Sequence, residues 1–486
     1  MVVVVGAGAT GLGVAWDLVL RGVPVTVVDA GDLGRGTSGR FHGLLHSGGR
    51  YVVRDQAAAR ECWKENQIIR RIAPSAVEDT GGYFIESAEE ASGFADEWVA
   101  GCRAVGLPVQ EEAPDQLRRL VPEVRQDLRR VFRVADAVLE GFRLLHLLSR
   151  NIAEHGGVLL TRTRVDKVAM AAGRVVGVEV EGPAGRRQIA CDLLVNAAGP
   201  WAGQVSELYG DPIPLQLGGG LMLIFANRHT PVVVNRLAPP GDGDILVPHQ
   251  SVVIFGTTDV RQQDPEPPAV ARGEVLRLME LGRAMFPSMG SWRVLRAFTG
   301  VRPLYQPART EGGLPSRWVT RDFTVIDSGR DAGVIAVVGG KFSTFRAMAE
   351  RTADQVAGHL GVTAPSRTQT QVLEAPMPAA TRSRDPVVCE CEGVAEAALD
   401  AEAGRPMADW RTRTWLAMGP CQGTFCIHRA AGLRRRRASA GRVATEVAAL
   451  RTERDRGFPA VLWGANAREW ALNRAVRAES LGEPLS

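Results

Sequence analysis

The sequence is poor in lysine, in aromatic residues and in long apolar runs. Only three of its 58 lysine and arginine residues are lysines, and aromatic residues make up 6% of the chain. No uninterrupted apolar run reaches the roughly 18 residues that span a bilayer, so we expect no transmembrane helix. The net charge of +4 is small for 486 residues and gives no reason to expect a nucleic-acid partner.

A secretion signal is also lacking. The N-terminal stretch MVVVVGAGATGLGVAWDLVLRG has no basic start, and its glycines and Asp17 interrupt the apolar run. We therefore expect a cytoplasmic protein whose seven cysteines stay out of disulfide bonds. With 45% apolar and 23% charged residues the composition is that of an ordinary soluble protein, and the length predicts two or three domains.

The N-terminus carries the pattern of a dinucleotide-binding βαβ unit. The β-branched run Val2–Val5 precedes three spaced glycines, and a second apolar strand ends at Asp29. Gly6 permits a tight turn, Gly8 lets the backbone approach a pyrophosphate, and Gly11 lets the helix pack on the strand. The Asp29 carboxylate can accept hydrogen bonds from ribose hydroxyls.

Further segments favour FAD over NAD as the dinucleotide. Residues 31–49 are rich in Gly, Ser and Thr, and residues 162–168 predict a strand with Val165 placed to touch an adenine. Residues 193–203 and 333–350 are two more strand–glycine units, and the helix start in the second would stabilise negative charge on a reduced flavin. The cofactor-binding candidates are Gly6, Gly8, Gly11, Asp29, Thr37, Ser38, His42, Val165, Ala198, Gly199, Gly339, Gly340, Lys341, Ser343 and Thr344.

Four of the seven cysteines lie in one short C-terminal stretch. Cys389 and Cys391 form a C-x-C pair, and Cys421 and Cys426 form a C-x4-C pair. Thiolates at this spacing bind soft metals or an iron–sulfur cluster. Zinc sites more often use C-x2-C pairs, so we favour a [2Fe–2S] cluster and keep zinc as the alternative. The other three cysteines fit small buried hydrophobic residues.

Several motifs occur in the order found in FAD-dependent glycerol-3-phosphate dehydrogenases. They are RFHGLLHSGGRY, VNAAGPW, GTTD, TGVRPL, TRDF and GGKFSTFR, followed by CEC and GPCQGTFC. Over nearly its whole length the chain resembles the catalytic A subunits of the anaerobic members, whose cysteine module is similar to bacterioferritin-associated ferredoxin. The resemblance implies an α/β fold with three parts. These are a Rossmann-like FAD-binding domain of the D-amino-acid-oxidase type, a discontinuous β-sheet substrate domain, and a small, mostly helical iron–sulfur module.

The domain boundaries follow from this resemblance and from composition. The expected FAD-binding segments are 1–80, 140–205 and 320–362, and the expected substrate-domain segments are 81–139 and 206–319. A stretch rich in Ser, Thr, Pro and Ala, 363–386, predicts a linker. After it we expect the cysteine module, 387–435, and a helical tail, 436–486.

The resemblance implies oxidation of sn-glycerol 3-phosphate to dihydroxyacetone phosphate by hydride transfer to FAD. It also implies electron transfer through a [2Fe–2S] cluster to B and C type subunits and a quinone. The membrane would then be reached only peripherally, through these partners, on its cytoplasmic face. An amine or amino-acid dehydrogenase subunit of the same fold is the alternative. A third possibility, from another functional class, is a non-catalytic electron-transfer or assembly subunit. Such a subunit would bind FAD but would lack an open, polar pocket over the flavin.

A phosphorylated substrate needs cations for its phosphate, and guanidinium groups match that geometry well. The motifs supply five substrate-binding candidates: Arg50, Tyr51, Arg302, Arg321 and Lys341. Lys341 stands out because lysine is so scarce in this chain. Arg302 lies between apolar segments, where an unpaired charge would be costly.

The base that removes the hydroxyl proton must lie within hydrogen-bond reach of the substrate. His46 is the first catalytic candidate, with orientation of its loop as the structural alternative, and His249 is a weaker candidate. Arg302, also a catalytic candidate, could stabilise the forming alkoxide. In one departure from the family pattern, Gly219 and Leu221 replace a lysine and a serine. This departure predicts a phosphate site that is short of one cation and one hydroxyl.

Overall fold

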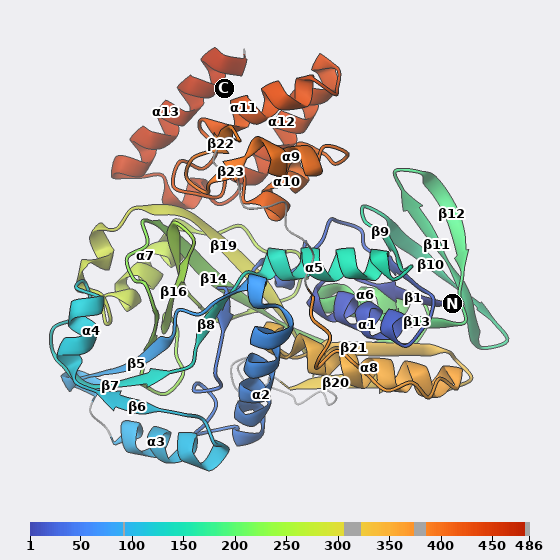
Figure 1. The fold of residues 1–486 in the computed structure, drawn as a ribbon, viewed down its shortest axis with the longest axis horizontal. Helices are drawn as coiled ribbons and strands as arrows, with labels where there is room; N and C mark the ends of the chain where they lie inside the picture. Colours follow the sequence, from blue (N-terminus) through green and yellow to red (C-terminus); the bar gives the residue numbers. More distant parts are fainter. Residues whose placement is uncertain (91–92, 306–321, 374–384, 482–486) are drawn as a thin grey trace.

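The computed structural model describes residues 1–90, 93–305, 322–373 and 385–481. Two parts that contain β-sheets lie side by side, and a helical C-terminal part rests across them (Figure 1). The N-terminus lies in the right-hand part in this view. The left-hand part contains the larger sheet, and the C-terminal helices lie at the top.

The right-hand part is built on a six-stranded sheet in which β20 is the antiparallel edge strand. Its strands in spatial order are β20 (Phe323–Asp327), β21 (Val334–Gly339), β13 (Leu193–Asn196), β1 (Val2–Val5), β2 (Val25–Val28) and β9 (Val158–Leu160). Every residue of β1, β2 and β13 is buried, as parallel strands covered on both faces require. The central position of β1 puts the N-terminal glycine turn in the middle of the sheet edge.

The two faces of β1 pack against different layers. Val2 and Val4 belong to a core shared with helices α1 (Ala9–Leu20), α5 (Gly141–Glu154) and α8 (Phe345–Leu360). Val3 and Val5 belong to a core shared with a second, three-stranded sheet. That sheet consists of β10 (Arg164–Ala171), β11 (Arg174–Gly182) and β12 (Gly185–Ala190). The predicted strand at 162–168 is thus the start of β10.

The left-hand part is built on a nine-stranded sheet drawn from two separate stretches of chain. Its strands are β18 (Val260–Gln262), β14 (Leu215–Ala226), β17 (Val252–Gly256), β16 (Ile245–His249), β15 (Val233–Arg236), β5 (Gly82–Ser87), β7 (Leu128–Val134) and β6 (Gln110–Glu112), with β19 (Val294–Tyr305) also paired to β14. The chain enters this sheet, returns to the six-stranded sheet and then enters the nine-stranded sheet again. The predicted fold class, α/β with a Rossmann-like domain and a discontinuous β-sheet domain, is confirmed.

Short elements complete the two parts. A small sheet joins them through β3 (Leu44–Leu45), β8 (Ala137–Leu139) and β4 (Val77–Glu78). The helices α2 (Gln56–Ile72), α3 (Phe94–Val105), α4 (Pro114–Leu120), α6 (Ala202–Glu207) and α7 (Arg272–Gly282) lie around the sheets. Buried Trp98 of α3 packs against Phe84 and Phe132, which fastens this helix to the large sheet.

The C-terminal part has its own hydrophobic core. Its elements are β22 (Val387–Cys389), β23 (Val394–Ala395), α9 (Glu396–Ala401), α10 (Met407–Thr414), α11 (Cys426–Arg435), α12 (Ala440–Asp455) and α13 (Gly464–Leu481). Val443, Val447 and Leu450 of α12 belong to this core, so its packing continues past residue 435. Phe458 and Val461 instead enter the core of the large sheet and anchor the C-terminal part to it.

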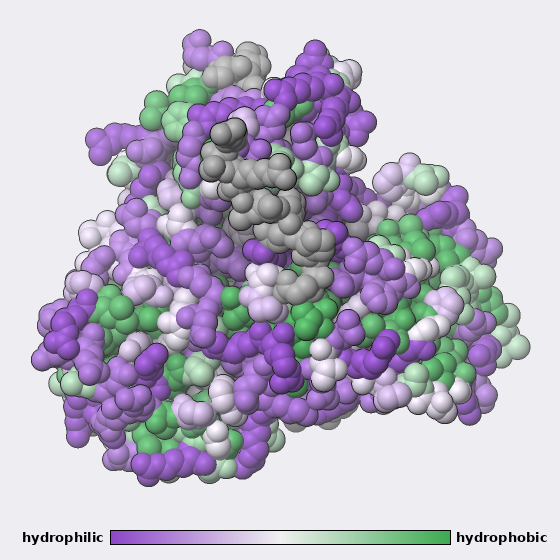
Figure 2. All heavy atoms as spheres, in the orientation of Figure 1, coloured by the Kyte–Doolittle hydropathy of each residue, from purple (hydrophilic) through white to green (hydrophobic). Residues whose placement is uncertain are grey.

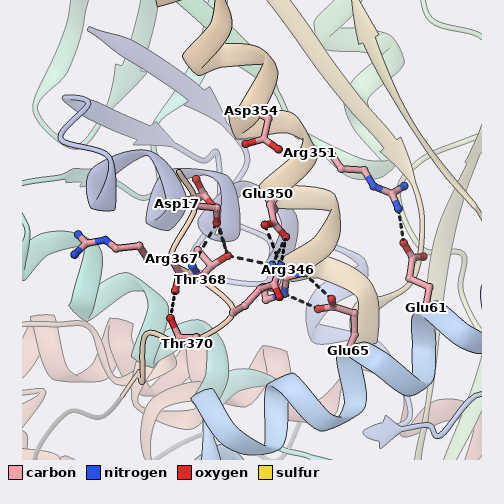
Figure 3. Close-up of polar contacts among 12 residues, drawn as sticks. Asp17, Glu61, Glu65, Arg346, Glu350, Arg351, Asp354, Arg367, Thr368 and Thr370 are labelled. Carbon is pink, nitrogen blue, oxygen red and sulfur yellow. Dashed lines mark hydrogen bonds and ion pairs between the residues drawn. The ribbon is translucent and has the colours of Figure 1, made fainter. Parts of the chain in front are cut away.

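A buried ion-pair network ties the chain after α8 to the FAD-binding part (Figure 3). Arg346 of α8 donates to both carboxylate oxygens of Glu65 on α2, at 2.7 and 2.6 Å, and to Glu350 at 2.5 Å. It also donates to the Thr368 hydroxyl at 3.1 Å. Within the predicted linker, Thr368 is therefore packed, whereas residues 374–384 lie outside the described part of the chain.

The visible surface in Figure 2 is mostly hydrophilic, with hydrophobic residues in scattered patches. In the described ranges, no helix combines the length and the hydropathy of a membrane span.

Candidate active site

A cavity of about 1220 Å³ lies between the two sheet-containing parts. Val5 and Gly6 at the carboxyl end of β1 form part of one wall, and Gly339 at the end of β21 extends it. Gly220 of β14 and Arg302 of β19 belong to the opposite part. A cavity of this size at the carboxyl edge of a parallel sheet is the usual place for a nucleotide cofactor.

The glycine turn after β1 has the close contacts that the sequence pattern predicts. Gly6 has φ of +114°, and a Cβ at Gly11 would lie 1.9 Å from the Gly6 carbonyl oxygen. Glycine is therefore required at position 6 for the turn and at position 11 for the packing of α1 against that turn. Ala9 N–H, at the start of α1, donates to the Ser38 hydroxyl at 3.0 Å, which fixes the neighbouring loop against this turn. The turn fits a pyrophosphate at a helix N-terminus.

Asp29 stands at the end of β2, on the cavity wall. Its two carboxylate oxygens accept hydrogen bonds from Ala7 N–H and Gly31 N–H, both at 2.7 Å. Burial raises the pKa of Asp29, although both backbone donors favour the charged form. Each oxygen keeps a second lone pair, so the group fits a ribose hydroxyl as a further donor.

The structure gathers most of the predicted cofactor residues around this one cavity. Two exceptions are Gly11 and Thr344, which support the wall from behind: Gly11 packs on Gly6, and Thr344 donates to the Lys341 carbonyl at 3.2 Å. The predicted residues that line the cavity are Gly6, Gly8, Asp29, Thr37, Ser38, His42, Val165, Ala198, Gly199, Gly339, Gly340, Lys341 and Ser343. Their arrangement, glycine turn included, fits FAD.

His46 lies on the cavity wall, in the loop after β3. Its Nε2 is 2.9 Å from the Ser343 hydroxyl, which belongs to the turn between β21 and α8. The His46 ring packs against Tyr51 at 5.5 Å, and the Lys341 ammonium lies 4.9 Å from the centre of the Tyr51 ring. A candidate base, a phenol and a cation from distant sequence positions therefore share one wall of the cavity.

The predicted cations differ in their partners. Arg302 donates to Asp259 at 2.7 Å and to the carbonyls of Thr258 and Gly219, and Arg50 donates to Asp244 at 3.2 Å. Lys341 forms no ion pair with any residue that the structure describes. Arg321 lies outside the described residues. Of the predicted substrate-binding cations that the structure describes, Lys341 is therefore the one without an ion pair.

The Gly219 and Leu221 departure falls on the face of β14 that turns away from the cavity. Leu221 is buried in the core of the large sheet, and a Cβ at Gly219 would lie 2.5 Å from the Gln262 amide nitrogen. Gly220 and Met222 line the cavity instead. The expected loss of a cation and a hydroxyl therefore does not alter the cavity wall itself, because alternate residues of a strand face opposite sides.

His249, the weaker base candidate, is buried outside the cavity lining. Its ring packs on Trp415 of the C-terminal part at 4.8 Å, and its Nδ1 is 3.3 Å from the Glu140 carboxylate. The imidazole of His249 also packs against Gly43, where a Cβ would lie 2.8 Å from the ring. This position suits a contact between the parts of the protein better than proton transfer to a substrate.

Several lining residues were missed in the sequence. Arg54 follows Arg50 by four positions, and Thr257, Thr258 and Asp259 form the GTTD segment after β17. Thr258 carries no charge. Its hydroxyl oxygen accepts a hydrogen bond from Leu221 N–H at 3.0 Å, which ties the segment after β17 to β14. GTTD was recognised only as a family motif, because nothing in its composition places it beside Arg302.

The four C-terminal cysteines come together. The Cys426 thiol contacts the sulfurs of Cys389 and Cys421, and Cys391 contacts Cys421. Hydrogen bonds from Cys426 and from backbone N–H groups lower the pKa of Cys389 to about 6 and of Cys421 to about 5. Burial raises the pKa of Cys391 to about 11.

Two of these cysteines therefore favour the thiolate, which is the form that binds metals. In the described ranges, no group of three or more His, Cys, Asp or Glu residues has the geometry to hold a metal ion. The chemistry of four neighbouring thiols nevertheless suits a cluster in which the cysteines are shared between two irons. The three remaining cysteines are buried and protonated, since burial raises the pKa of Cys62 and Cys102 to about 12 and of Cys191 to about 11.

Comparison with known proteins agrees with this geometry. Residues 1–355 match the family model of FAD dependent oxidoreductases. The A1 subunit of the anaerobic glycerol-3-phosphate dehydrogenase of Haloferax volcanii is 36% identical, over 99% of this chain and 90% of the relative. The corresponding A subunit of Escherichia coli K12 is 34% identical, over 98% of this chain and 95% of its own.

Solved structures share the fold. The FAD complex of the Bacillus halodurans glycerol-3-phosphate dehydrogenase has a TM-score of 0.59 at 21% identity, with 98% of this chain and 82% of that one covered. L-proline dehydrogenase from P. horikoshii has a TM-score of 0.61 at 17% identity, with coverages of 76% and 96%. Fold, cavity and sequence lead to the same assignment: this chain belongs to the FAD-dependent oxidoreductases, in the family of the anaerobic glycerol-3-phosphate dehydrogenase A subunits.

Proposed function

We propose that this protein oxidises sn-glycerol 3-phosphate to dihydroxyacetone phosphate. The observation that carries the proposal is the Lys341 ammonium, which lines the cavity beside Tyr51 and His46 without an ion pair in the described chain. A half-buried cation of this kind is stabilised by an anionic substrate group such as a phosphate. The two relatives named as glycerol-3-phosphate dehydrogenase subunits support the same substrate.

Each residue of this wall has a role in the proposal. Lys341, with Arg50 and Tyr51, holds the phosphate, and Arg302 is fixed by Asp259 where it faces the reacting end of the substrate. When bound, FAD supplies the acceptor for the hydride. His46 takes the hydroxyl proton: when Nε2–H donates to the Ser343 hydroxyl oxygen, Nδ1 is the basic nitrogen. Ser343 thereby sets both the orientation and the tautomer of the imidazole.

An amino-acid dehydrogenase is the second candidate. Asp259 and Asp244 already neutralise Arg302 and Arg50, and one remaining cation would suffice for an amino-acid carboxylate. The size of the cavity and the charged side chains in its lining argue against a purely structural or assembly role. Anaerobic addition of sn-glycerol 3-phosphate is the direct test, because it should reduce the bound flavin in the absence of any partner.

The proposal extends to the four-cysteine centre, which would carry a [2Fe–2S] cluster and pass electrons singly towards B and C type subunits and a quinone. The contacts among all four sulfurs support it, and the relatives are themselves named as subunits of a larger enzyme. The protein would reach the membrane only peripherally, through those partners.

Metal and sulfide analysis of the purified protein tests this centre. We expect about two irons and about two acid-labile sulfides per chain, because a [2Fe–2S] cluster is held by four thiolates. Cys421→Ser should remove both while leaving the FAD content unchanged. Stoichiometric zinc without sulfide would contradict the iron–sulfur assignment.

A further inference from the structure

Three arginines from different elements meet where the C-terminal part rests on β19. Arg296 of β19 is 6% exposed, Arg454 of α12 is 1% exposed, and the Arg411 side chain on α10 is 17% exposed. Arg411 acts electrostatically on Arg296, and both of them act on Arg454. These residues are called the buried arginine group below.

The group has far fewer carboxylates than cations. Arg454 donates to the Gln422 side-chain oxygen and, at 3.3 Å, to the Met418 sulfur. Arg296 donates to the main-chain carbonyls of residues 456 and 453, at 2.8 and 3.4 Å. Glu453, 3.6 Å from Arg411, is the carboxylate that the group contacts in the described chain. The guanidinium Nε of each arginine is buried and has no hydrogen-bond partner among the described residues.

Such an excess of buried positive charge is costly. An arginine that leaves water without a counter-ion loses several kcal/mol of hydration, and a neighbouring arginine adds repulsion. Burial lowers the pKa of Arg296 to about 10, and it lowers the pKa of Arg454 further. The arrangement is therefore expected only where an anion other than Glu453 lies close by.

The four-cysteine centre lies next to the group. Gln422 and Met418, the two side chains that contact Arg454, flank Cys421 in the loop before α11. Cys426 also interacts electrostatically with Arg454. Gln422 also donates to the Met418 and Gly419 carbonyls, at 3.1 and 2.9 Å, so the contact with Arg454 reaches the backbone of the cysteine loop.

We propose that the buried arginine group is the counter-charge of the iron–sulfur centre and raises its reduction potential. This inference rests on the proposed [2Fe–2S] cluster. Since Arg296 belongs to β19 of the substrate part, the counter-charge is complete only when the C-terminal part is docked. Docking therefore makes the centre a better acceptor of electrons from the flavin.

The electron balance explains why the buried arginine group raises the reduction potential. Reduction adds one electron from the reduced flavin, converts one ferric iron to ferrous iron and breaks no bond. Two ferric ions, two sulfides and four thiolates already carry a net negative charge, and the added electron increases it by one unit. A fixed positive charge in a poorly solvated site stabilises the reduced form more than the oxidised form.

Potentiometric titration of the cluster, followed by the electron paramagnetic resonance of its reduced form, tests the inference in the full-length holoprotein. For Arg454→Gln we expect at least a tenfold smaller equilibrium constant for reduction, which is a potential about 59 mV more negative. Arg411→Gln should shift the potential in the same direction. Because Arg411 is less buried, it provides the measurement if the Arg454 variant does not fold.

Two control variants separate charge from packing. Arg454→Lys keeps the charge and should keep most of the potential. Arg442→Gln removes a charge from the exposed side of the same helix, where Arg434 still pairs with Glu446, and should leave the potential unchanged. Wild-type potentials in both glutamine variants at positions 454 and 411 would overturn the inference, as would a wild-type protein without iron. If the potentials shift but sn-glycerol 3-phosphate does not reduce the flavin, only the proposed substrate fails.

Discussion

Lys341→Met should lower kcat/KM for sn-glycerol 3-phosphate by roughly 10- to 150-fold. That range corresponds to the roughly 1.5–3 kcal/mol of a hydrogen bond to a charged group. The cavity offers no substitute for this charge among the described residues that we assign to the phosphate, because Arg50 is already paired with Asp244. Steady-state kinetics with an artificial electron acceptor measures the loss.

Two control variants test whether the charge of Lys341 is responsible for the loss. Lys341→Arg should retain much of the activity, and Lys167→Met, on the exposed edge of the three-stranded sheet, should change nothing. FAD content should be the same in all three variants, because the methylene chain and backbone of residue 341 are retained. Equal kcat/KM for Lys341→Met and the wild type would remove Lys341 from the phosphate site.

Arg346→Met should lower the free energy of unfolding by about 3–5 kcal/mol, as expected when one partner of a buried ion pair is removed. Glu65 is 1% exposed and accepts two hydrogen bonds from Arg346, so its carboxylate would be left buried without a cation. Urea denaturation of the FAD-loaded protein, followed by far-ultraviolet circular dichroism, measures the change.

The same two helices supply a matched control. Arg351 of α8 pairs with Glu61 of α2 at 3.0 Å, but its side chain is 60% exposed (Figure 3). Arg351→Met should cost about 0–1 kcal/mol, because solvent screens this pair. Adding Glu65→Leu to Arg346→Met should recover part of the loss, since the buried carboxylate at position 65 is then removed together with its cation. Similar losses for the Arg346 and Arg351 variants would show that burial of the network does not determine its strength.

Local sequence patterns predicted the FAD-binding edge well. A β-branched run, a glycine turn and an acidic residue at the next strand end are all determined within about thirty residues by backbone geometry. The structure accordingly brings Gly6, Gly8 and Asp29 to one wall. The family motifs extended this to His46 and Ser343, whose contact spans 297 positions and has no local signal.

The ion-pair partners of the site residues, and the side of the sheet that each residue faces, could not be predicted in the same way. Nothing near Arg302 in the sequence indicates that Asp259, 43 positions earlier, neutralises it. The face of the sheet on which Gly219 and Leu221 lie depends on the register of β14 against its neighbours. A shift of one residue would move both residues to the opposite face. The buried arginine group joins α10, α12 and β19, so only the docked C-terminal part reveals it.

Anaerobic titration of the FAD-loaded protein with sn-glycerol 3-phosphate tests the account most directly. The flavin absorption band near its visible maximum should bleach, and glycerol, which lacks the phosphate, should have no effect at the same concentration. Amino acids such as L-proline should likewise leave the band unchanged. Bleaching by an amino acid, with none by sn-glycerol 3-phosphate, would contradict the proposed function.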